Sequence, residues 1–293
     1  MLLNIRYYIL MITSVFLALG IGIIIGFSLD GQEIFVEQQQ GLINELEQRF
    51  EEIRNENISL KTMTDIKDFE LALYESFSKN IFSRLVKDCL CGLKVAVIDC
   101  GDTFTNIELV DTLELAGATV SSVTMLKEEF FNPDLQNVVV FNEGKDGPME
   151  NDQMYSCLSD RLVDAVVSGD DEGHARRMKE LGFIKITGEY DSVVDYFIIT
   201  GCFCKGNDNR AETAGISLLE AVKNSSIPVV GVEKSSCEES YITHYKTMEI
   251  SSVDNIDSII GRYSLVKVLQ GSEGHYGVKD TADALVPGID TTM

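Results

Sequence analysis

The residues with the clearest chemical potential are two close cysteine pairs, Cys89-x-Cys91 and Cys202-x-Cys204. Thiolates are soft ligands that suit Cu(I) or Zn, so Cys202 and Cys204 are candidate metal ligands. The same two residues also fit an ordinary strand end, because no second ligand motif accompanies them. The sequence therefore predicts no resident cofactor and leaves the binding of a copper ion open.

Motifs for nucleophilic or metal-dependent catalysis do not occur in the sequence. It has no G-x-S-x-G and no H-E-x-x-H, and His174, His244 and His275 lie far apart. The turn DCGDTFTN after the first predicted strand lacks the G-x-G-x-x-G and the Walker lysine that hold nucleotide phosphates. Its acidic residues Asp99 and Asp102 would repel a pyrophosphate. We therefore expect a protein that is not an enzyme and binds no nucleotide.

Composition excludes further classes of partner. The formal net charge of −23 repels phosphate backbones and anionic lipid head groups, so nucleic acid is not an expected partner. The apolar content is sufficient for a core, which excludes a miniature fold held by disulfides. Because seven cysteines is an odd number, at least one thiol is free or pairs between chains.

The stretch from Tyr7 to Leu29 has no charged residue. As a helix it would be roughly 34 Å long, enough to cross a hydrocarbon core of about 30 Å. It exceeds the apolar core of about 7–15 residues in a cleaved signal peptide, so residues 1–30 are predicted to be an uncleaved transmembrane anchor in the cell membrane. Arg6 before it and acidic residues after it favour a cytoplasmic N-terminus and an extracytoplasmic main domain. The number of cysteines is more typical of a reducing compartment.

Small residues recur along one face of this predicted span. Ala18, Gly22 and Gly26 are spaced by four, a pattern that lets two membrane helices approach closely. An alternative is that glycine and alanine are simply common in membrane helices.

Residues 31–90 predict a coiled-coil stalk. With Phe50 at heptad position a, seven of the ten a and d positions from Val36 to Lys67 are apolar or are Asn57. A lone Asn at position a can fix the register of a parallel dimer. The predicted partner is therefore a second copy of the chain, with Phe50 and Asn57 at the interface. The alternative is an amphipathic helix that packs within one chain.

Beyond Leu60 the spacing of apolar residues changes. It is three and then repeatedly four, over Met63, Ile66, Phe69, Leu73, Phe77, Ile81 and Leu85. A run of fours drifts around an ideal helix. We expect this face to turn from the dimer toward the following domain and to dock on it.

Residues 91–293 predict a Rossmann-like α/β domain of three layers with a mostly parallel sheet. KVAVIDC, ATVSSVTM, NVVVF, DYFIIT and IPVVGVE are typical of buried strands. TNIELVDTLELAG and AETAGISLLEAVKNS are typical of the helices between them, and Thr105 and Glu108 have capping-box spacing. Alternation of strands and helices is the basis of the fold assignment.

The last segment carries two distinctive motifs, Val-Asp-Asn-Ile-Asp from 253 and Gly-His-Tyr-Gly-Val from 274. Together with the opening NIRYYILMITSVFLALGIGIIIGFSLDGQ, they resemble the MctB/SteB family, which includes copper transporter MctB. The resemblance covers the whole layout of span, coiled coil and α/β domain. It implies a role in copper transport or homeostasis at the cell envelope. SteB-like members imply an alternative: a homodimeric scaffold that binds a SteA-like membrane protein and controls cell-wall hydrolysis during division.

Two functions are open for the motif residues. Asp257 or Ser258 suits the N-cap of a helix from Ile259 to Gln270, with Asp254 and Asn255 in the turn before it. Gly274 and Gly277 bracket His275 and Tyr276 in a loop that needs unusual backbone angles. These residues either shape a docking surface or fold the C-terminal segment, and they provide no cysteine or methionine cluster for copper.

Overall fold

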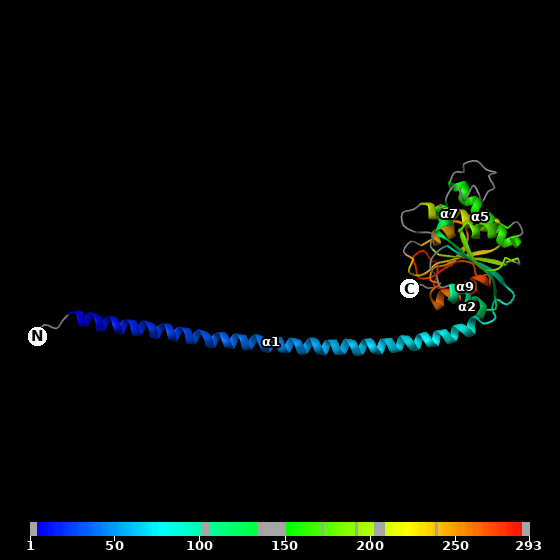
Figure 1. Ribbon diagram of the computed structural model, residues 1–293. Helices are drawn as coiled ribbons and strands as arrows, with labels where there is room; N and C mark the ends of the chain where they lie inside the picture. The colour runs from blue at the N-terminus through cyan, green and yellow to red at the C-terminus, as the bar shows by residue number, and fades with distance from the viewer. Residues whose placement is uncertain are drawn as a thin grey trace. The chain divides into compact units, whose positions relative to one another are not determined.

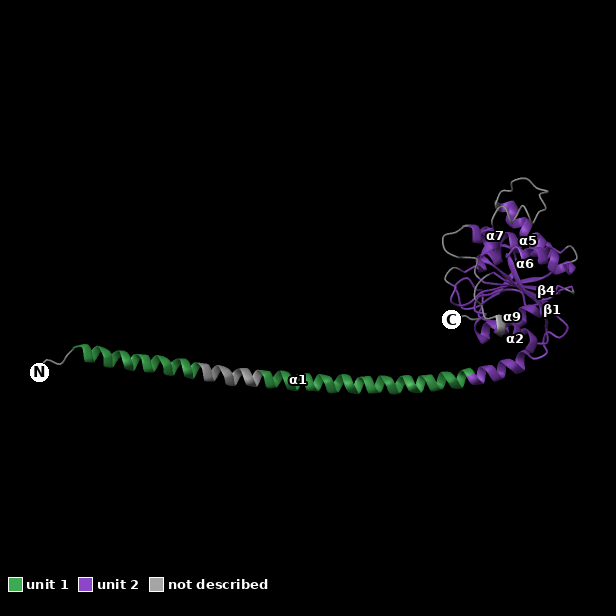
Figure 2. Cartoon of the chain, viewed as in Figure 1, with its two compact units in different colours: residues 1–75 green, residues 76–293 purple. Residues whose placement is uncertain are grey.

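The protein is described by a computed structural model that covers residues 5–100, 106–133, 151–170, 173–190, 193–201, 209–237 and 240–288. It divides into two compact units, Met1–Glu75 and Ser76–Met293 (Figure 2). The described part of the first unit is helical. The second contains the end of that helix and the α/β domain, which we call the head.

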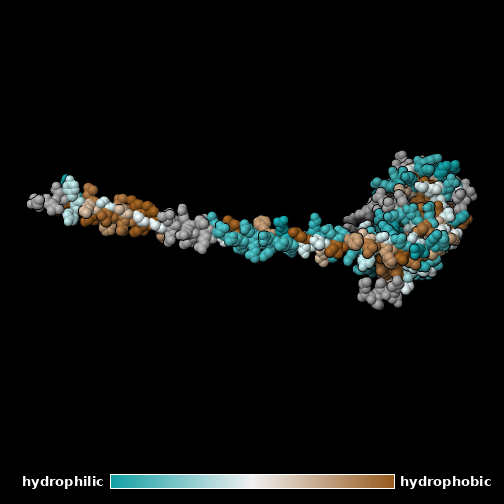
Figure 3. Space-filling view, turned by 90° about the horizontal axis from the view of Figure 1, so that it is seen from below, coloured by the Kyte–Doolittle hydropathy of each residue, from teal (hydrophilic) through white to brown (hydrophobic). Residues whose placement is uncertain are grey.

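Helix α1 (Ile5–Val86) is 82 residues long. Its first part, Ile5–Phe27, is long and apolar enough to cross a membrane. Brown, apolar side chains cover most of this part in Figure 3, whereas brown and teal are mixed along α1 beyond residue 38. We call residues 31–86 the stalk. The N-terminal apolar helix is therefore as predicted, and the coiled coil stays a prediction.

A seven-stranded sheet in the order β3-β2-β1-β4-β5-β6-β7 forms the centre of the head (Figure 1). All its neighbouring strands are parallel except β2 and β3. This confirms the prediction of a mostly parallel sheet. The bounds are β1 Lys94–Asp99, β2 Thr119–Leu126, β3 Ile184–Gly188, β4 Tyr196–Thr200, β5 Val229–Val232, β6 Ser251–Val253 and β7 His275–Tyr276.

Four of the five predicted strands are present as β1, β2, β4 and β5, and NVVVF lies outside the described residues. Strand β1 is buried from Val95 to Asp99, as expected for a central parallel strand covered on both faces. The sequence analysis missed β3, β6 and β7. Strands β3 and β7 are the two edges of the sheet, where an apolar run is not required, and β6 beside β7 has only three residues.

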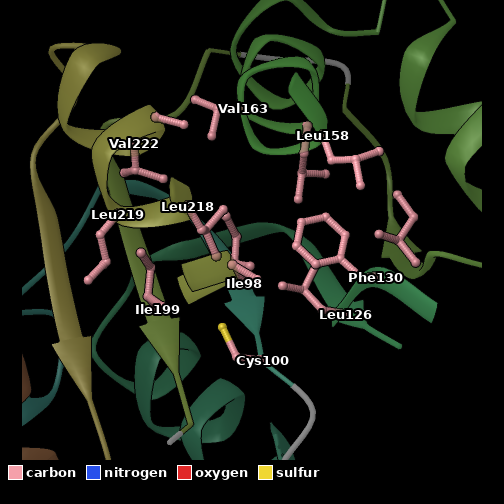
Figure 4. Close-up of a cluster of buried hydrophobic side chains, with 14 of the residues drawn as sticks. Ile98, Cys100, Leu126, Phe130, Leu158, Val163, Ile199, Leu218, Leu219 and Val222 are labelled. Atoms are coloured by element: carbon pink, nitrogen blue, oxygen red, sulfur yellow. The ribbon is translucent and has the colours of Figure 1, made fainter. Parts of the chain in front are cut away.

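Helices cover both faces of the sheet, with α5 and α7 on one side and α2 and α9 on the other (Figure 1). Their bounds are α2 Asn106–Leu115, α3 Glu128–Phe131, α5 Asn151–Ser168, α6 His174–Glu180, α7 Asn209–Asn224, α8 Ile242–Thr247 and α9 Ile259–Leu269. The core under α5 and α7 includes Ile98, Phe130 and Leu218 (Figure 4). A second core lies under α2 and α9. The helices expected at α2, α7 and α9 are all present, and Thr105 of the proposed capping box lies outside the described residues.

The end of α1 packs on the head through fewer residues than predicted. Val86 is fully buried in the core under α2 and α9, and Phe82 packs against it. Phe77 and Leu85, which we expected on the docking face, are exposed. The docking prediction was wrong in its choice of face because residues 82 and 86 follow 81 and 85 by one position, about 100° around the helix.

Candidate functional site

Four buried polar residues stand in a row where the parallel strands end. Asp99 ends β1, Thr200 ends β4, Glu233 follows β5 and Asp254 follows β6, and each is at most 1% exposed. Strand register pairs residue 99 with 200. In open α/β sheets this carboxyl edge is the usual place for a functional site, above all where the strand order reverses. That point lies between β1 and β4, and residues 101–105 and 202–208, which come shortly after these strands, lie outside the described part.

Asp254 joins the two C-terminal motifs into one structure. Its carboxylate accepts hydrogen bonds from the backbone N–H groups of Val278 at 2.7 Å and Lys279 at 2.9 Å. Gly277 has φ near 149°, and a Cβ at this position would overlap the Asp254 carboxylate. The glycine is therefore required because the backbone and a buried carboxylate approach each other closely.

Glu233 and Lys279 form a second connection between the sheet and the C-terminal segment. Lys279 Nζ lies 2.8 Å from Glu233 Oε1, and the Glu233 side chain is 0% exposed. Ser240 Oγ donates to the same oxygen at 2.6 Å, and the Tyr241 N–H donates to Oε2 at 2.9 Å. This buried carboxylate is thus paired and hydrogen-bonded at both oxygens, as burial of a charge requires.

The residues before α9 organise the start of that helix. Ser258 is the N-cap, and its Oγ accepts a hydrogen bond from the Gly261 N–H at 2.9 Å. Asp257 instead accepts from the backbone and the hydroxyl of Ser235, and these bonds lower its pKa although burial opposes this. A Cβ on Gly261 would overlap the Asn255 carbonyl oxygen. Of the two N-cap candidates, the structure selects Ser258.

Residues 274–277 extend the sheet by one short strand. His275 Nδ1 lies 2.9 Å from Ser252 Oγ, and Tyr276 OH donates to the Glu273 carbonyl. Burial lowers the pKa of His275; Asp283 opposes the change and Lys246 adds to it. Gly274 has φ near 145°, so both glycines of this motif have the unusual, positive φ angles that were predicted.

These contacts make one clasp, residues 274–288, over the carboxyl edge of the sheet. The sequence analysis identified Asp254 and Gly277 but missed Glu233, Ser240 and Lys279. A glutamate directly after the apolar strand VVGV was the available signal, since a charge at a strand end needs a partner. The contacts of the motif residues lie within the head, and their use as a docking surface stays a prediction.

A buried thiol and a buried phenol lie near the same edge. Burial raises the pKa of Cys100, and neighbouring Asp99 adds to the rise. Burial also raises the pKa of Tyr245, with Cys100 and Glu233 as further causes. The Tyr245 ring occupies the space in which a side chain on Gly231 would lie. The pair therefore fills the core, and both groups stay protonated near neutral pH.

The predicted metal ligands Cys202 and Cys204 lie outside the described residues. Cys89 and Cys91 are free thiols, and Cys89 Sγ lies 3.2 Å from the Leu85 carbonyl oxygen. His174 is the first residue of α6, and His244 stacks on Tyr241. Within the described part of the chain, no three Cys, His, Asp or Glu side chains gather in a way that could hold a metal ion.

The residues predicted at a dimer interface all lie on α1, where the described part of the chain does not bury them. Ala18 and Phe50 are exposed, and a Cβ on Gly22 or Gly26 would meet nothing within 4 Å. Asn57 Nδ2 donates to the Ile53 carbonyl at 2.9 Å. These side chains are therefore available to a partner helix.

The apolar N-terminal helix, which is long enough to cross a membrane, and the α/β head with a mostly parallel sheet fit a membrane-associated α/β protein. Residues 2–287 match the family described as copper transport outer membrane protein, MctB. The chain belongs to this family, as its terminal motifs predicted. No curated protein matches the chain.

Proposed function

We propose that this protein acts in copper transport or copper homeostasis at the cell envelope without catalysing a reaction. The family match over residues 2–287 carries the proposal, because it includes the span, the stalk and the head together. Copper is here the cargo of the pathway. A single span cannot enclose a conducting path by itself, so the protein acts within an assembly.

The first member of that assembly is a second copy of the chain, in a parallel homodimer. We call the a and d positions of the predicted coiled coil the seam. Phe50 is 70% exposed and Ile53 is 54% exposed, although both are large apolar residues of the seam. Exposed apolar surface of this kind is typical of an interaction site. Anchoring of both copies in one bilayer favours the parallel arrangement that Asn57 suits.

The head lies outside the cytoplasm in this proposal. Cys237 is disulfide-bonded, which favours an oxidising compartment and agrees with the charges around the span. A reporter enzyme fused after Met293 tests the topology. A fusion active only in the cytoplasm would reverse the assignment.

Growth in copper tests the function. Cells without the protein should be more sensitive to copper than the parent strain, and the full-length chain should restore tolerance. If the thiol pairs handle copper directly, serine at Cys89, Cys91, Cys202 and Cys204 should abolish the rescue, whereas Cys237→Ser, which removes the disulfide but neither pair, should retain it. Unchanged tolerance in cells that lack the protein would contradict the copper role.

A second candidate is a division scaffold that binds a SteA-like membrane protein. The exposed apolar residues of the stalk favour it, because protein contacts would bury them. In this case Phe50→Asp should impair cell separation, while the four serine substitutions leave both separation and copper tolerance unchanged. Normal separation with Phe50→Asp, in a variant shown to be monomeric, would argue against the scaffold.

A further inference from the structure

The heptad frame of the stalk continues beyond the point where the spacing of apolar residues changes. Counting from Phe50 at a, the next positions after Lys67 are Leu71 (a), Tyr74 (d), Ser78 (a), Ile81 (d) and Leu85 (a). Four of these five side chains are large and apolar. All of these four are exposed, from 39% for Ile81 to 66% for Tyr74. The seam is therefore interrupted by Thr64 and Lys67 but resumes in the same register.

The other side of the same helical turns is fixed to the head. Val86 and Leu90 are buried in the core under α2 and α9. After the helix, the Asp88 N–H donates to the Leu115 carbonyl and the Leu90 N–H donates to the Ala116 carbonyl at 2.7 Å. These residues lie in one compact unit with the head. Whatever packs on Ile81 and Leu85 is therefore placed relative to the head as well.

An exposed apolar residue of the head lies next to the end of this seam. Leu115, the last residue of α2, is 39% exposed. Its carbonyl accepts from the N–H of Asp88, two residues beyond the end of α1. The exposed apolar residues at the end of α1 are therefore followed by an exposed apolar residue of the head.

We propose that the homodimer interface continues through Leu71, Tyr74, Ile81 and Leu85 to Leu115, so that a second copy covers the junction of stalk and head. This inference rests on the proposed parallel homodimer. Its new claim is the position at which the dimer interface ends. As a consequence, the two heads are held in a fixed relation by the stalks instead of moving independently on them.

A second copy is the occupant that this surface fits. Two chains anchored by the same span in one bilayer begin their stalks at the same height, so each a and d position meets its own equivalent. Charges at the flanking e and g positions do not consistently favour the dimer. Glu56 and Lys61 would attract each other across it. Like charges would meet in two other pairs, Arg49 with Arg54 and Glu70 with Glu75. The apolar seam must therefore carry the association, and its continuation to Leu85 lengthens it.

Photo-crosslinking of the full-length protein in its membrane tests the inference. p-Benzoylphenylalanine is placed singly at Ile53, Ile81, Leu85 or Leu115, all of which are exposed in one chain, so the head keeps its core. Ser76, at heptad position f on the outer side of the helix, is the matched control. We expect covalent dimers from positions 81, 85 and 115 as efficiently as from 53, and several-fold more than from 76.

The outcomes separate the two proposals. Dimers from position 53 with none from 81 and 85 would overturn the extended interface and leave the homodimer standing. No dimers from any position would overturn the homodimer itself. Crosslinks from 81 and 85 to a different protein would show that another partner, and not a second copy, covers the junction.

Discussion

In the head, the large apolar side chains lie in two cores and the buried carboxylates of Glu233 and Asp254 have donors from their own chain. Along the stalk, Phe50 and Phe69 are each 70% exposed. The head therefore buries its large apolar side chains within one chain, whereas the stalk exposes the apolar side chains that the proposed homodimer would bury. Substitutions in the head should change unfolding but not association, and substitutions in the stalk seam should do the reverse.

The largest effect on the head is expected from Lys279→Met. It leaves the Glu233 carboxylate buried without its counter-ion, which typically costs about 3–5 kcal/mol of unfolding free energy. Denaturant unfolding of the full-length protein in detergent, followed by tyrosine fluorescence, measures the loss. Glu233→Gln combined with Lys279→Met should recover part of it. A loss below about 1 kcal/mol would show that the pair is effectively at the surface.

Gly277→Ala should destabilise the clasp somewhat less. The added Cβ would overlap the Asp254 carboxylate at a backbone angle that alanine disfavours. Gly271→Ala is the matched control, because Gly271 also has positive φ but a Cβ there meets nothing within 4 Å. We expect a loss about 2 kcal/mol larger at 277 than at 271. Equal losses would assign the effect to backbone angle alone.

Ser258→Ala should have a smaller effect, because it removes the N-cap of α9 and leaves the rest of the clasp. The Gly261 N–H loses its acceptor, which costs about 1 kcal/mol. Ser258→Asp, which can also cap a helix, should retain most of the stability in the same unfolding measurement. If alanine and aspartate behaved alike, the hydrogen bond to Gly261 would not matter.

The smallest effect is expected from the titration of His275. Burial lowers the pKa of this side chain in the folded head below the ordinary 6.5, so the unfolded chain binds the proton more tightly. Stability should therefore fall as pH decreases through and below about 6.5, and His275→Gln should reduce this slope. A slope unchanged by the substitution would assign the pH dependence to other groups.

Elements of the head that depend on a local sequence pattern could be predicted, whereas contacts between residues far apart in the chain could not. Buried strands such as β1 and β4 and the helix α9 follow from apolar runs and capping residues. The pairing of Glu233 with Lys279 could not be predicted, because it joins residues far apart in the chain across strands β5 and β6. The choice of Phe82 and Val86 as the residues that dock on the head also depends on the turn after α1, which periodicity does not determine.

The C-terminal motifs show the same limit. Their glycines predicted unusual backbone angles, which Gly274 and Gly277 adopt. The contact between Gly277 and Asp254 could not be predicted, because it depends on how the fold brings the two motifs together. On the stalk, the heptad frame predicted a seam, which stays a prediction, and exposure in the folded chain was needed to see that Ile81 and Leu85 remain available to a partner.

The native mass of the full-length protein in detergent tests most directly the claim that the stalk is completed by a second copy. Light scattering on a sizing column should give the mass of two chains after correction for detergent. Ile53→Asp with Leu60→Asp, which places charges at two seam positions, should give the mass of one chain while the head unfolds as in the wild type. A single-chain mass for the wild-type protein, at concentrations where the head is folded, would contradict the account.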